Sequence, residues 1–451
     1  MVDIKTHLKK SNGIVFSVYA IIASFSTYSC MYAFRKPFAV ATFDELNFAG
    51  VDYKVWLIIA QVLGYTLSKF TGIKVVSELE GKNRAGALLL LITLAGLSLF
   101  FFAITPAPYN IIFLFINGLP LGMVWGIVFS YLEGRRFTEV LGAGLSVSFI
   151  FSSGFVKSIG KYLMLRWGVS EFWMPFLTSA LFIIPLFISV WLLNKIPPPS
   201  KEDERLRTKR EPMDKVDRSK FMKEFSLGLV FLIIAYMFLT AFRDFRDNFA
   251  AEIWQALGYG GSAEIFTVTE IPIAFGILVV IGSLFLIKDN KKALIINHII
   301  ILIGIAMVGV STFSFESDWI GAPLWMILVG FGLYLGYVPF NSVLFERLIA
   351  TFRCTGNVGF VIYLADSFGY LGSVGVLLYK EFGYTEISWL HFFISSAYML
   401  SIIGSLLIIA SLIYFYYKYG KQDEILEKKK IPKQVVNSIL DQDTSHIIVP
   451  N

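Results

Sequence analysis

The tripeptide Ala33-Phe34-Arg35 ends the first long apolar run of this chain, and Ala241-Phe242-Arg243 ends the run that opens its second half. Further charge follows in both places, with Lys36 after the first tripeptide and Asp244 after the second. A motif at corresponding places in two halves indicates a duplicated chain in which two arginines face one another. Membrane proteins built from repeats hold their ligand at the interface between the repeats, so this pair is the first candidate for a binding site.

The composition of the chain identifies it as an integral membrane protein. Of its 451 residues, 56% are hydrophobic and only 16% are charged, whereas an ordinary soluble domain carries about 25% charged residues. The net charge of +6 could indicate a nucleic-acid partner, but the basic residues are spread over short loops between apolar runs. We therefore expect a lipid bilayer, and no nucleic acid, as the partner of this surface.

Long apolar runs divide the chain into membrane spans. A helix needs roughly 20 apolar residues to cross a bilayer, and runs of this length exclude membrane strands. The sequence thus predicts an all-α integral membrane protein of about twelve transmembrane helices. The predicted spans are 14–38, 55–77, 84–104, 109–132, 140–165, 173–195, 226–249, 264–287, 292–313, 321–346, 356–379 and 389–417.

These spans fall into two six-helix bundles. The first bundle comprises residues 1–195 and the second residues 226–418. A charged linker at 196–225 joins them, and a polar tail at 419–451 follows the second. Loops rich in Lys and Arg alternate with loops such as Thr105-Pro106-Ala107-Pro108, which has no charge. Because cytoplasmic loops are rich in Lys and Arg, the linker, the tail and both termini are predicted to be cytoplasmic, in the inner (plasma) membrane.

A second echo supports the duplication. Gly118-Leu119-Pro120-Leu121-Gly122 in the fourth span matches Gly332-Leu333-Tyr334-Leu335-Gly336 in the tenth. Small residues also let membrane helices approach closely. The match between the two segments therefore reflects either duplication of the chain or convergence on close helix packing.

Twelve helices in two halves with a charged cytoplasmic linker resemble the major facilitator superfamily. Two stretches resemble the organophosphate:phosphate antiporters of that superfamily, namely Tyr32-Ala33-Phe34-Arg35-Lys36-Pro37-Phe38 in the first span and Gly64-Tyr65-Thr66-Leu67-Ser68-Lys69-Phe70 in the second. The resemblance implies that Arg35 and Arg243 grip a substrate phosphate and that Lys69 is an auxiliary cation.

The chain also departs from the antiporter pattern. Ser152 stands where the antiporters have a histidine in the fifth span. As a whole, the sequence is similar to an uncharacterised group of bacterial facilitator-like membrane proteins, which carry the motifs Arg35-Lys36-Pro37-Phe38 and Arg243-Asp244-Phe245-Arg246-Asp247.

Lys69 is placed deep in a predicted span. From Lys54 to Lys69 the helix would rise roughly 22 Å, so the ammonium lies well inside the apolar slab. A lysine there costs about 2.5 kcal/mol or more unless it meets a partner or a polar cavity. Lys69 is therefore either one member of a structural ion pair or an anion ligand in a cavity.

Arg35 would lie near the outer rim of a straight helix, where a snorkelling side chain is the alternative to a functional one. Its repetition at Arg243 favours function, and a guanidinium offers a planar fork of donors that suits phosphate and carboxylate. The candidate substrate-binding residues are Arg35, Lys36, Lys69, Arg243, Arg246 and Tyr65.

Several acidic residues in predicted spans could carry a coupling proton or balance a cation. Asp247 follows Arg243 by four residues, so both lie on one helix face. Asp366, in the middle of the eleventh span, would carry a proton or pair with Lys157 or Lys69. The coupling or ion-pair candidates are Asp366, Asp247, Asp244, Lys157 and Glu270.

Charged residues at predicted cytoplasmic helix ends could form a gate. Glu133 with Arg135, and Glu346 with Arg347, would pair across loops, although solvated helix ends explain them equally well. The chain carries no phosphate-binding Gly-x-x-x-x-Gly-Lys-Ser/Thr motif. It also has no clustered His or Cys set for a metal. We therefore expect no cofactor, no metal and no enzymatic activity.

Three functions remain open. The first is a secondary-active transporter that moves a small organic anion, phosphorylated or carboxylated, by alternating access. The second is a proton-coupled carrier of a neutral or zwitterionic solute in which Asp366 carries the proton. The third is a membrane sensor that has the facilitator fold and transports nothing.

Overall fold

The computed structural model describes residues 4–44, 46–133, 135, 138–200, 203, 215–284, 286–352, 358–383 and 387–421. The first group of helices, called here the N-terminal group, is α1 (Ile4–Lys10), α2 (Gly13–Ala33), α3 (Tyr53–Glu78), α4 (Arg84–Ile104), α5 (Ile111–Ser130), α6 (Thr138–Trp167), α7 (Met174–Leu181) and α8 (Ile183–Asn194). Short 3-10 turns η1 (Pro37–Val40) and η2 (Gly81–Asn83) and an antiparallel hairpin of β1 (Asn47–Phe48) and β2 (Val51–Asp52) lie between these helices.

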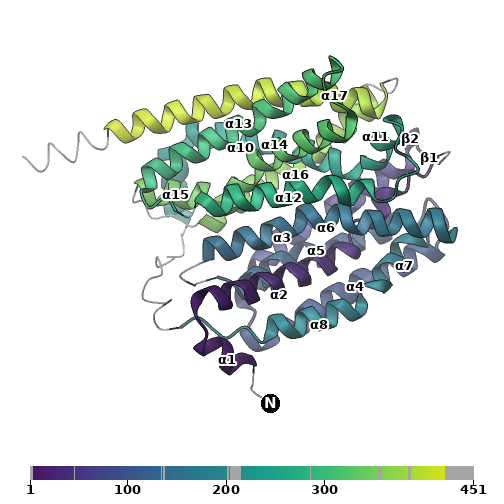
Figure 1. The fold of residues 1–451 in the computed structure, drawn as a ribbon, viewed down its shortest axis with the longest axis horizontal. Coiled ribbons are helices and arrows are strands. Elements are labelled where there is room, and N and C mark those ends of the chain that lie inside the picture. Colours follow the sequence, from purple (N-terminus) through teal and green to yellow (C-terminus); the bar gives the residue numbers. More distant parts are fainter. Residues whose placement is uncertain are drawn as a thin grey trace, which may run out of the picture.

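The second group, called here the C-terminal group, begins at α10. Its elements are α10 (Lys215–Asn248), α11 (Ala250–Ala256), α12 (Ile265–Leu284), α13 (Asn290–Glu316), α14 (Ala322–Ser342), α15 (Leu344–Phe352), α16 (Val358–Gly383), α17 (Trp389–Met399) and the π-turn η3 (Leu400–Gly404). Figure 1 shows the long helices of the N-terminal group in the lower part of the molecule and those of the C-terminal group in the upper part. The two groups meet where α12 packs on α6 and α16 packs on α3.

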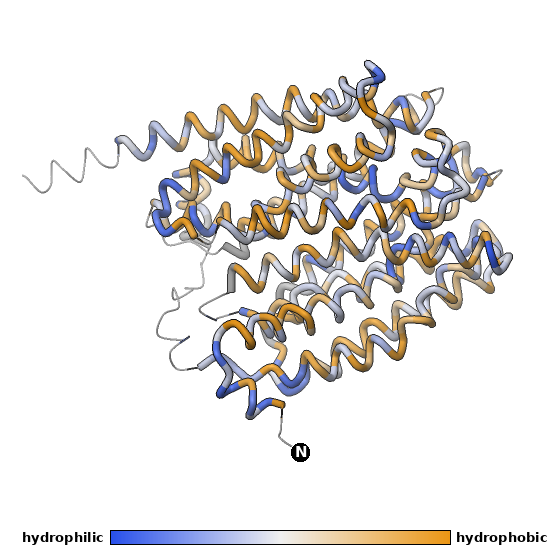
Figure 2. Tube along the Cα trace, in the orientation of Figure 1, coloured by the Kyte–Doolittle hydropathy of each residue, from blue (hydrophilic) through white to orange (hydrophobic). Residues whose placement is uncertain are grey.

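The long helices are suited to a bilayer in length and in composition. Within the described residues, nine helices are long and apolar enough to span a membrane, or ten if the bent pair α7 and α8 is one span. Figure 2 shows hydrophobic residues along these helices and hydrophilic residues mainly at their ends. The all-α membrane fold predicted from the sequence is confirmed.

Two further helices, α3 and α16, coincide with the predicted spans 55–77 and 356–379, and each is 26 residues long. They are not among the helices counted above. These are the helices that carry Lys69 and Asp366.

Three predicted boundaries differ from those of the structure. The span predicted at 173–195 is broken at Phe182, where α7 and α8 meet at 45°. Pro185 lies in the first turn of α8, and its ring clashes with the carbonyl group four residues earlier, which prevents a continuous helix. α10 begins at Lys215, inside the segment predicted as linker. The last helix continues to Lys421, and most of the predicted tail lies outside the described residues.

The predicted first span also ends early. α2 stops at Ala33, and a three-residue turn leads to Pro37 at the start of η1. Pro37 has no N–H to donate to the carbonyl group of Ala33, and its ring would clash with that carbonyl, so the α-helix cannot continue through it. Arg35 therefore lies in a turn, not on a helix, whereas Arg243 lies within α10.

The glycine echo is a packing feature in both groups. A Cβ added to Gly118 on α5 would lie 2.3 Å from the backbone oxygen of Gln61 on α3, and a Cβ added to Gly332 on α14 would lie 2.5 Å from the backbone oxygen of Gly304 on α13. Both crossings thus bring backbone against backbone. The partner helices, α3 and α13, are the second and the ninth of the predicted spans and do not correspond between the halves.

Candidate functional site

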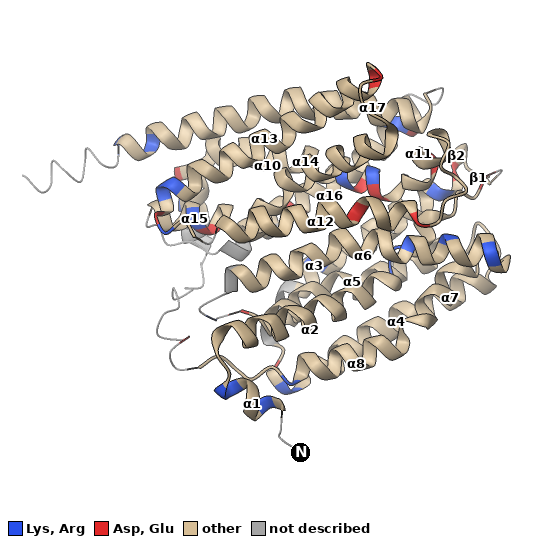
Figure 3. Ribbon diagram, in the orientation of Figure 1, with Lys and Arg blue, Asp and Glu red and all other residues tan. Residues whose placement is uncertain are grey.

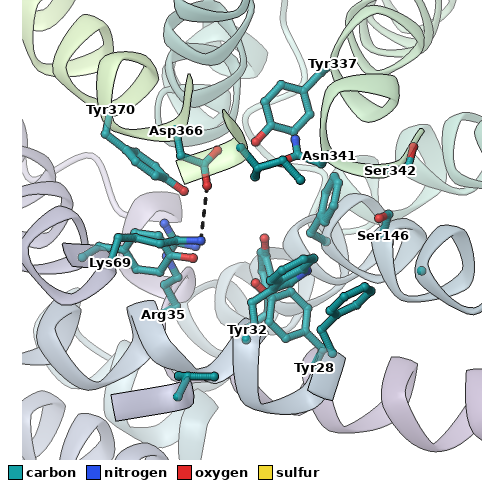
Figure 4. Close-up of a pocket in the computed structure, with 18 of the residues that line it drawn as sticks. Tyr28, Tyr32, Arg35, Lys69, Ser146, Tyr337, Asn341, Ser342, Asp366 and Tyr370 are labelled. Carbon is teal, nitrogen blue, oxygen red and sulfur yellow. Dashed lines mark hydrogen bonds and ion pairs between the residues drawn. The ribbon is translucent and has the colours of Figure 1, made fainter. Parts of the chain in front are cut away.

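A cavity of about 450 Å³ lies between the two groups of helices. Its wall is formed by α2, α3, α5 and α6 from the N-terminal group and by α10, α14 and α16 from the C-terminal group. Figure 4 shows Arg35, Lys69, Asp366 and several tyrosines around this space. Of the six candidate substrate-binding residues, five line it, namely Arg35, Lys36, Tyr65, Lys69 and Arg243.

Hydrogen bonds to backbone carbonyl groups hold Arg35 in the cavity wall. The Gln61 side chain donates to the Arg35 carbonyl oxygen at 3.0 Å, and the Asn117 side chain donates to the Phe34 carbonyl oxygen at 3.0 Å. These bonds satisfy carbonyl groups that the end of α2 leaves without helical partners. The turn that carries Arg35 is therefore tied to α3 and α5.

The Arg35 guanidinium is buried and lacks a counter-charge. Only 7% of the residue is exposed, and its Cζ lies 3.9 Å from the centre of the Tyr65 ring. Among the described residues, no carboxylate forms an ion pair with it, and its Nε is buried without a hydrogen-bond partner. The side chain does not snorkel to a membrane surface, and its donors are available to an anion in the cavity.

Arg243 has a similar ring contact and a different charge environment. Its Cζ lies 4.2 Å from the centre of the Tyr337 ring, as Arg35 lies over Tyr65. Its Nη2 donates to Asp244 at 2.7 Å, and the other oxygen of Asp244 accepts from Ser373 at 2.8 Å. The two arginines of the repeated motif are therefore unequal, because only Arg243 brings its own carboxylate.

Lys69 and Asp366 face one another across the cavity, as the dashed line in Figure 4 shows. Their Nζ and Oδ2 atoms are 3.4 Å apart, and the Tyr236 hydroxyl donates to the other oxygen of Asp366 at 2.6 Å. Lys69 is thus in an ion pair and also lines the cavity, and its role as an anion ligand remains a prediction. Of the two partners suggested for Asp366, the structure has Lys69 and not Lys157.

Asp247 does not pair with Arg243, although the two lie on one helix face. Its carboxylate instead contacts Lys36 at 2.5 Å and also binds Lys157 and the Ser153 hydroxyl. Asp244 is already bonded to Arg243, while two ammonium groups of the N-terminal group reach Asp247. Lys157 likewise belongs to this cluster and not to Asp366.

Arg246 does not line the main cavity. Its Nη1 donates to Glu270 at 2.7 Å and its Nη2 to the Met326 carbonyl oxygen at 3.2 Å, beside a separate small cavity between α6, α10 and α12. Arg246 therefore lies apart from the other five candidates, and its contact with a substrate remains a prediction. Figure 3 shows this interior group of acidic and basic residues near α12 and α16, away from the charged helix ends.

The main cavity extends from Arg35 and Arg243 to Glu133 and Glu346, the acidic residues of the predicted gate. Arg135 donates to the backbone oxygens of Tyr131 and Pro197, and Arg347 donates to Asn290 at 2.8 Å. The gate remains a prediction. Ser152 bonds Ser29 at 2.6 Å and is not a lining residue of the cavity.

The opposite end of the cavity is crossed by bonds between the two groups. Besides the Asp247 cluster, Lys54 at the start of α3 binds Glu252 on α11. The Ser158 hydroxyl on α6 also accepts from the backbone N–H of Thr267 on α12 at 3.1 Å. This is the end predicted to face away from the cytoplasm.

Apart from Tyr65, none of the tyrosines of the site was singled out from the sequence. Six of them line the cavity: Tyr28, Tyr32, Tyr65, Tyr334, Tyr337 and Tyr370. The available signal was their spacing, since Tyr28 and Tyr32 are four residues apart and share a helix face with Arg35 close behind. Their hydroxyls add neutral donors and acceptors to a cationic wall.

Comparison with known proteins identifies the family of the chain. Residues 37–418 match a family of unknown function, DUF5690. The chain belongs to this family. A search of curated proteins finds no significant match. The match begins after α2, so Tyr28, Tyr32, Arg35 and Lys36 lie outside it, whereas the other residues that line the cavity lie within it.

Solved structures resemble the chain in fold. A crystal structure of a D-xylose-proton symporter matches with a TM-score of 0.56 and 15% identity over 88% of this chain and 97% of the other. The nucleoside transporter NupG matches with a TM-score of 0.56 and 12% identity over 88% and 98%. A bacterial homologue of the human drug peptide transporters PepT1 and PepT2 matches with a TM-score of 0.57 and 12% identity over 89% and 99%.

This likeness establishes a major-facilitator-like fold for the DUF5690 chain. The three proteins reported above are named as a symporter, a transporter and a homologue of transporters. At such low identity the likeness concerns the fold alone. The resemblance to organophosphate:phosphate antiporters remains a prediction.

Proposed function

We propose that this protein is a secondary-active transporter that moves a small organic anion by alternating access. Arg35 is the observation that carries the proposal, because its buried guanidinium faces the central cavity and has no carboxylate partner among the described residues. A buried cation without a partner is strongly unfavourable. An anionic substrate in the cavity would remove that cost and occupy the planar fork of donors.

The interior charges favour an anion as well. The inner charged group is defined here as Arg35, Lys36, Lys69, Lys157, Arg243, Arg246, Asp244, Asp247, Glu270 and Asp366, which is six cations and four carboxylates. When all are ionised, this group carries an excess of two positive charges. Towards its predicted cytoplasmic end the cavity is also lined by Arg84, Glu133 and Glu346, so the excess belongs to the Arg35 end alone. A phosphate monoester or a dicarboxylate matches that excess, and a cavity of about 450 Å³ has room for the organic part.

The arrangement also supports alternating access. The cavity extends towards Glu133 and Glu346 at the predicted cytoplasmic end, while ion pairs cross its other end. We propose that this is the inward-facing conformation in the inner membrane, with both termini in the cytoplasm. Residues 1–195 and 226–418 would be the two moving bundles, and the fold shared with symporters and nucleoside transporters supports that mechanism.

The experiment that tests this function measures binding and flux together. Purified protein is screened by thermal shift against phosphorylated metabolites, carboxylates and neutral solutes, because a ligand of the folded state raises its apparent stability. Compounds that stabilise the protein are then tested for uptake into proteoliposomes. We expect anions to stabilise the wild type and the Arg166→Ala variant, which loses an exposed cation of α6, but not the Arg35→Ala variant. Stabilisation and uptake that are unchanged in Arg35→Ala would contradict the proposal.

A second candidate function has one observation in its favour. Asp366 lines the cavity, bonds Tyr236 and pairs with Lys69, so its proton could be exchanged as Lys69 moves. A proton-coupled carrier of a neutral or zwitterionic solute would lose proton-driven accumulation in Asp366→Asn but keep counterflow. Binding of anions without any flux would instead favour a membrane sensor.

A further inference from the structure

The Asp247 cluster joins the two groups of helices through one carboxylate. Lys36 follows α2 and Lys157 lies on α6, whereas Asp247 lies at the end of α10. Lys36 contacts Asp247 at 2.5 Å and Asn248 at 2.9 Å, and Lys157 binds both the carboxylate and the backbone oxygen of Asp247. Every bond from these two lysines to α10 therefore crosses between the groups.

The lysines are more deeply buried than their partner. The side chains of Lys36 and Lys157 are 6% and 4% exposed, whereas that of Asp247 is 14% exposed. Lys36 and Asp247 also line the main cavity, and Asp247 and Lys157 line the small cavity beside it. Asp247 and Lys36 thus lie at the main cavity, and Lys157 lies at the small cavity beside it.

Alternating access would separate these charges. Opening the closed end moves α10 away from α2 and α6, so Lys36 and Lys157 would lose the one carboxylate with which they pair among the described residues, while still largely enclosed by the N-terminal group. Two neighbouring buried ammonium groups without an anion carry two free-energy costs, one from desolvation and one from mutual repulsion. Another anion must take the place of Asp247 if that state is to be populated.

We propose that Lys36 and Lys157 form an anion-binding subsite, which the chain's own Asp247 occupies in this conformation and an exogenous carboxylate or phosphate group occupies when α10 moves away. The proposal rests on the proposed alternating access, because only that motion vacates the subsite in the wild type. Asp247 here stands in for the exogenous group: it is an oxyanion bonded by two ammonium groups and by the Ser153 hydroxyl.

The subsite adjoins the Arg35 site. Lys36 is the next residue after Arg35, and both line the same cavity. One substrate with two anionic groups could therefore contact Arg35 with the first and the lysines with the second. A separate small oxyanion bound at the lysines would satisfy the same chemistry, so the experiment must distinguish the two sources.

The test removes the internal competitor and measures anion affinity by titration calorimetry on the purified full-length protein. Asp247→Asn keeps the side-chain size and removes the charge. The probes are inorganic phosphate, which carries one oxyanion group, and succinate, which carries two. We expect Asp247→Asn to bind at least one probe about tenfold or more tightly than the wild type, since a charge-assisted hydrogen bond discriminates by that order. A gain in affinity for succinate alone would show that the lysines bind the second anionic group of one substrate. An equal gain in affinity for phosphate would show that they bind a separate small oxyanion.

Two further variants control the interpretation. Glu252→Gln breaks the Lys54 pair, which also joins the two groups, but Lys54 does not line the cavity, so its affinities should match those of the wild type. Adding Lys157→Gln to Asp247→Asn should abolish the gain. If Asp247→Asn does not fold, Asp247→Ser provides the same test with a smaller neutral side chain.

The inference and the proposed function fail in different ways. No gain in either Asp247 variant, an equal gain in Glu252→Gln, or a gain that persists without Lys157 would overturn the subsite. Such a result would leave the proposed function intact if the wild type still binds anions through Arg35. The proposed function would instead be contradicted if the Arg35→Ala variant bound anions as tightly as the wild type.

Discussion

The two arginines of the repeated motif differ in what accompanies them. Arg35 has an aromatic ring and no carboxylate among the described residues, whereas Arg243 has both a ring and Asp244. An anion that enters the cavity can bind Arg35 without displacing a protein group, but must compete with Asp244 for Arg243. We therefore expect Arg35 to contribute most of the initial affinity and Arg243 to contribute later, when its carboxylate is released.

The first prediction concerns the shape of the Arg35 cation. Arg35→Lys keeps the positive charge but replaces a planar fork of donors with a point charge. We expect the dissociation constant for inorganic phosphate or succinate to rise about tenfold, as the loss of one charge-assisted hydrogen bond predicts. Titration calorimetry measures this change directly. An affinity equal to that of the wild type would mean that charge alone, and not bidentate geometry, holds the anion.

The second prediction concerns Asp244. Asp244→Asn leaves Arg243 without its ion pair at the cavity wall, so we expect anion affinity to increase several-fold, by about 1 kcal/mol or more. Glu270→Gln serves as the matched control, because it frees Arg246, which does not line the main cavity. The same calorimetric titration compares the variants. Equal effects of the two substitutions would show that the gain comes from net charge and not from the position of Arg243.

At the scale of elements, the crossing of α3 and α5 determines the position of the cavity wall. Gly118 lets the two backbones touch, and the neighbouring side chains of Gln61 and Asn117 bond to one another at 2.8 Å and hold the turn of Arg35. Lys69 on α3 and Trp125 on α5 both line the cavity. The crossing therefore connects a packing motif in the sequence to the geometry of the site.

The third prediction tests this crossing. Gly118→Ala places a Cβ 2.3 Å from the backbone oxygen of Gln61, so the helices must separate, and we expect a loss of about 1–3 kcal/mol in the free energy of unfolding. Gly86→Ala on α4 is the control, since nothing lies within 4 Å of its added Cβ; it should be neutral or slightly stabilising through helix propensity. Thermal unfolding in detergent reports both. A stable Gly118→Ala protein would show that the crossing tolerates expansion.

The sequence was informative wherever a property depends on local spacing. The distance from Lys54 to Lys69 placed Lys69 inside the bilayer, and the run lengths predicted the helices, apart from the break before Pro185. The partners of Asp247 could not be found this way, because Lys36 and Lys157 reach it only through the packing of α2 and α6 against α10. Nor could spacing show that Arg35 lacks a carboxylate, because that depends on which helices the chain brings to the cavity.

At the scale of the whole molecule, the structure is open towards one end and closed at the other. The cavity reaches Glu346 near α15, whereas Lys54 and Glu252 join the two groups near the hairpin and α11. Figure 1 shows α15 and the hairpin at opposite ends of the molecule. Accessibility to reagents from the two sides of the membrane should therefore differ strongly.

The fourth prediction uses this difference. In a variant whose native cysteines are replaced by serine, Ser342→Cys at the cavity wall should react with a membrane-impermeant maleimide from the cytoplasmic side only. Tyr109→Cys, on a loop predicted to face away from the cytoplasm and 75% exposed, should react from the other side only. Labelling of inverted and right-side-out vesicles measures both. If Ser342→Cys reacted only from the non-cytoplasmic side, the predicted orientation would be wrong.

Among the described residues one carboxylate pairs with both Lys36 and Lys157, which has a consequence for sequence variation among relatives of this chain. Loss of Asp247 alone would leave two buried ammonium groups facing each other, and loss of one lysine alone would leave the other still paired. The order in which these three positions are substituted therefore affects stability. Along any lineage we expect a lysine to be replaced before the aspartate, so that the three positions covary as a unit although they lie far apart in the chain.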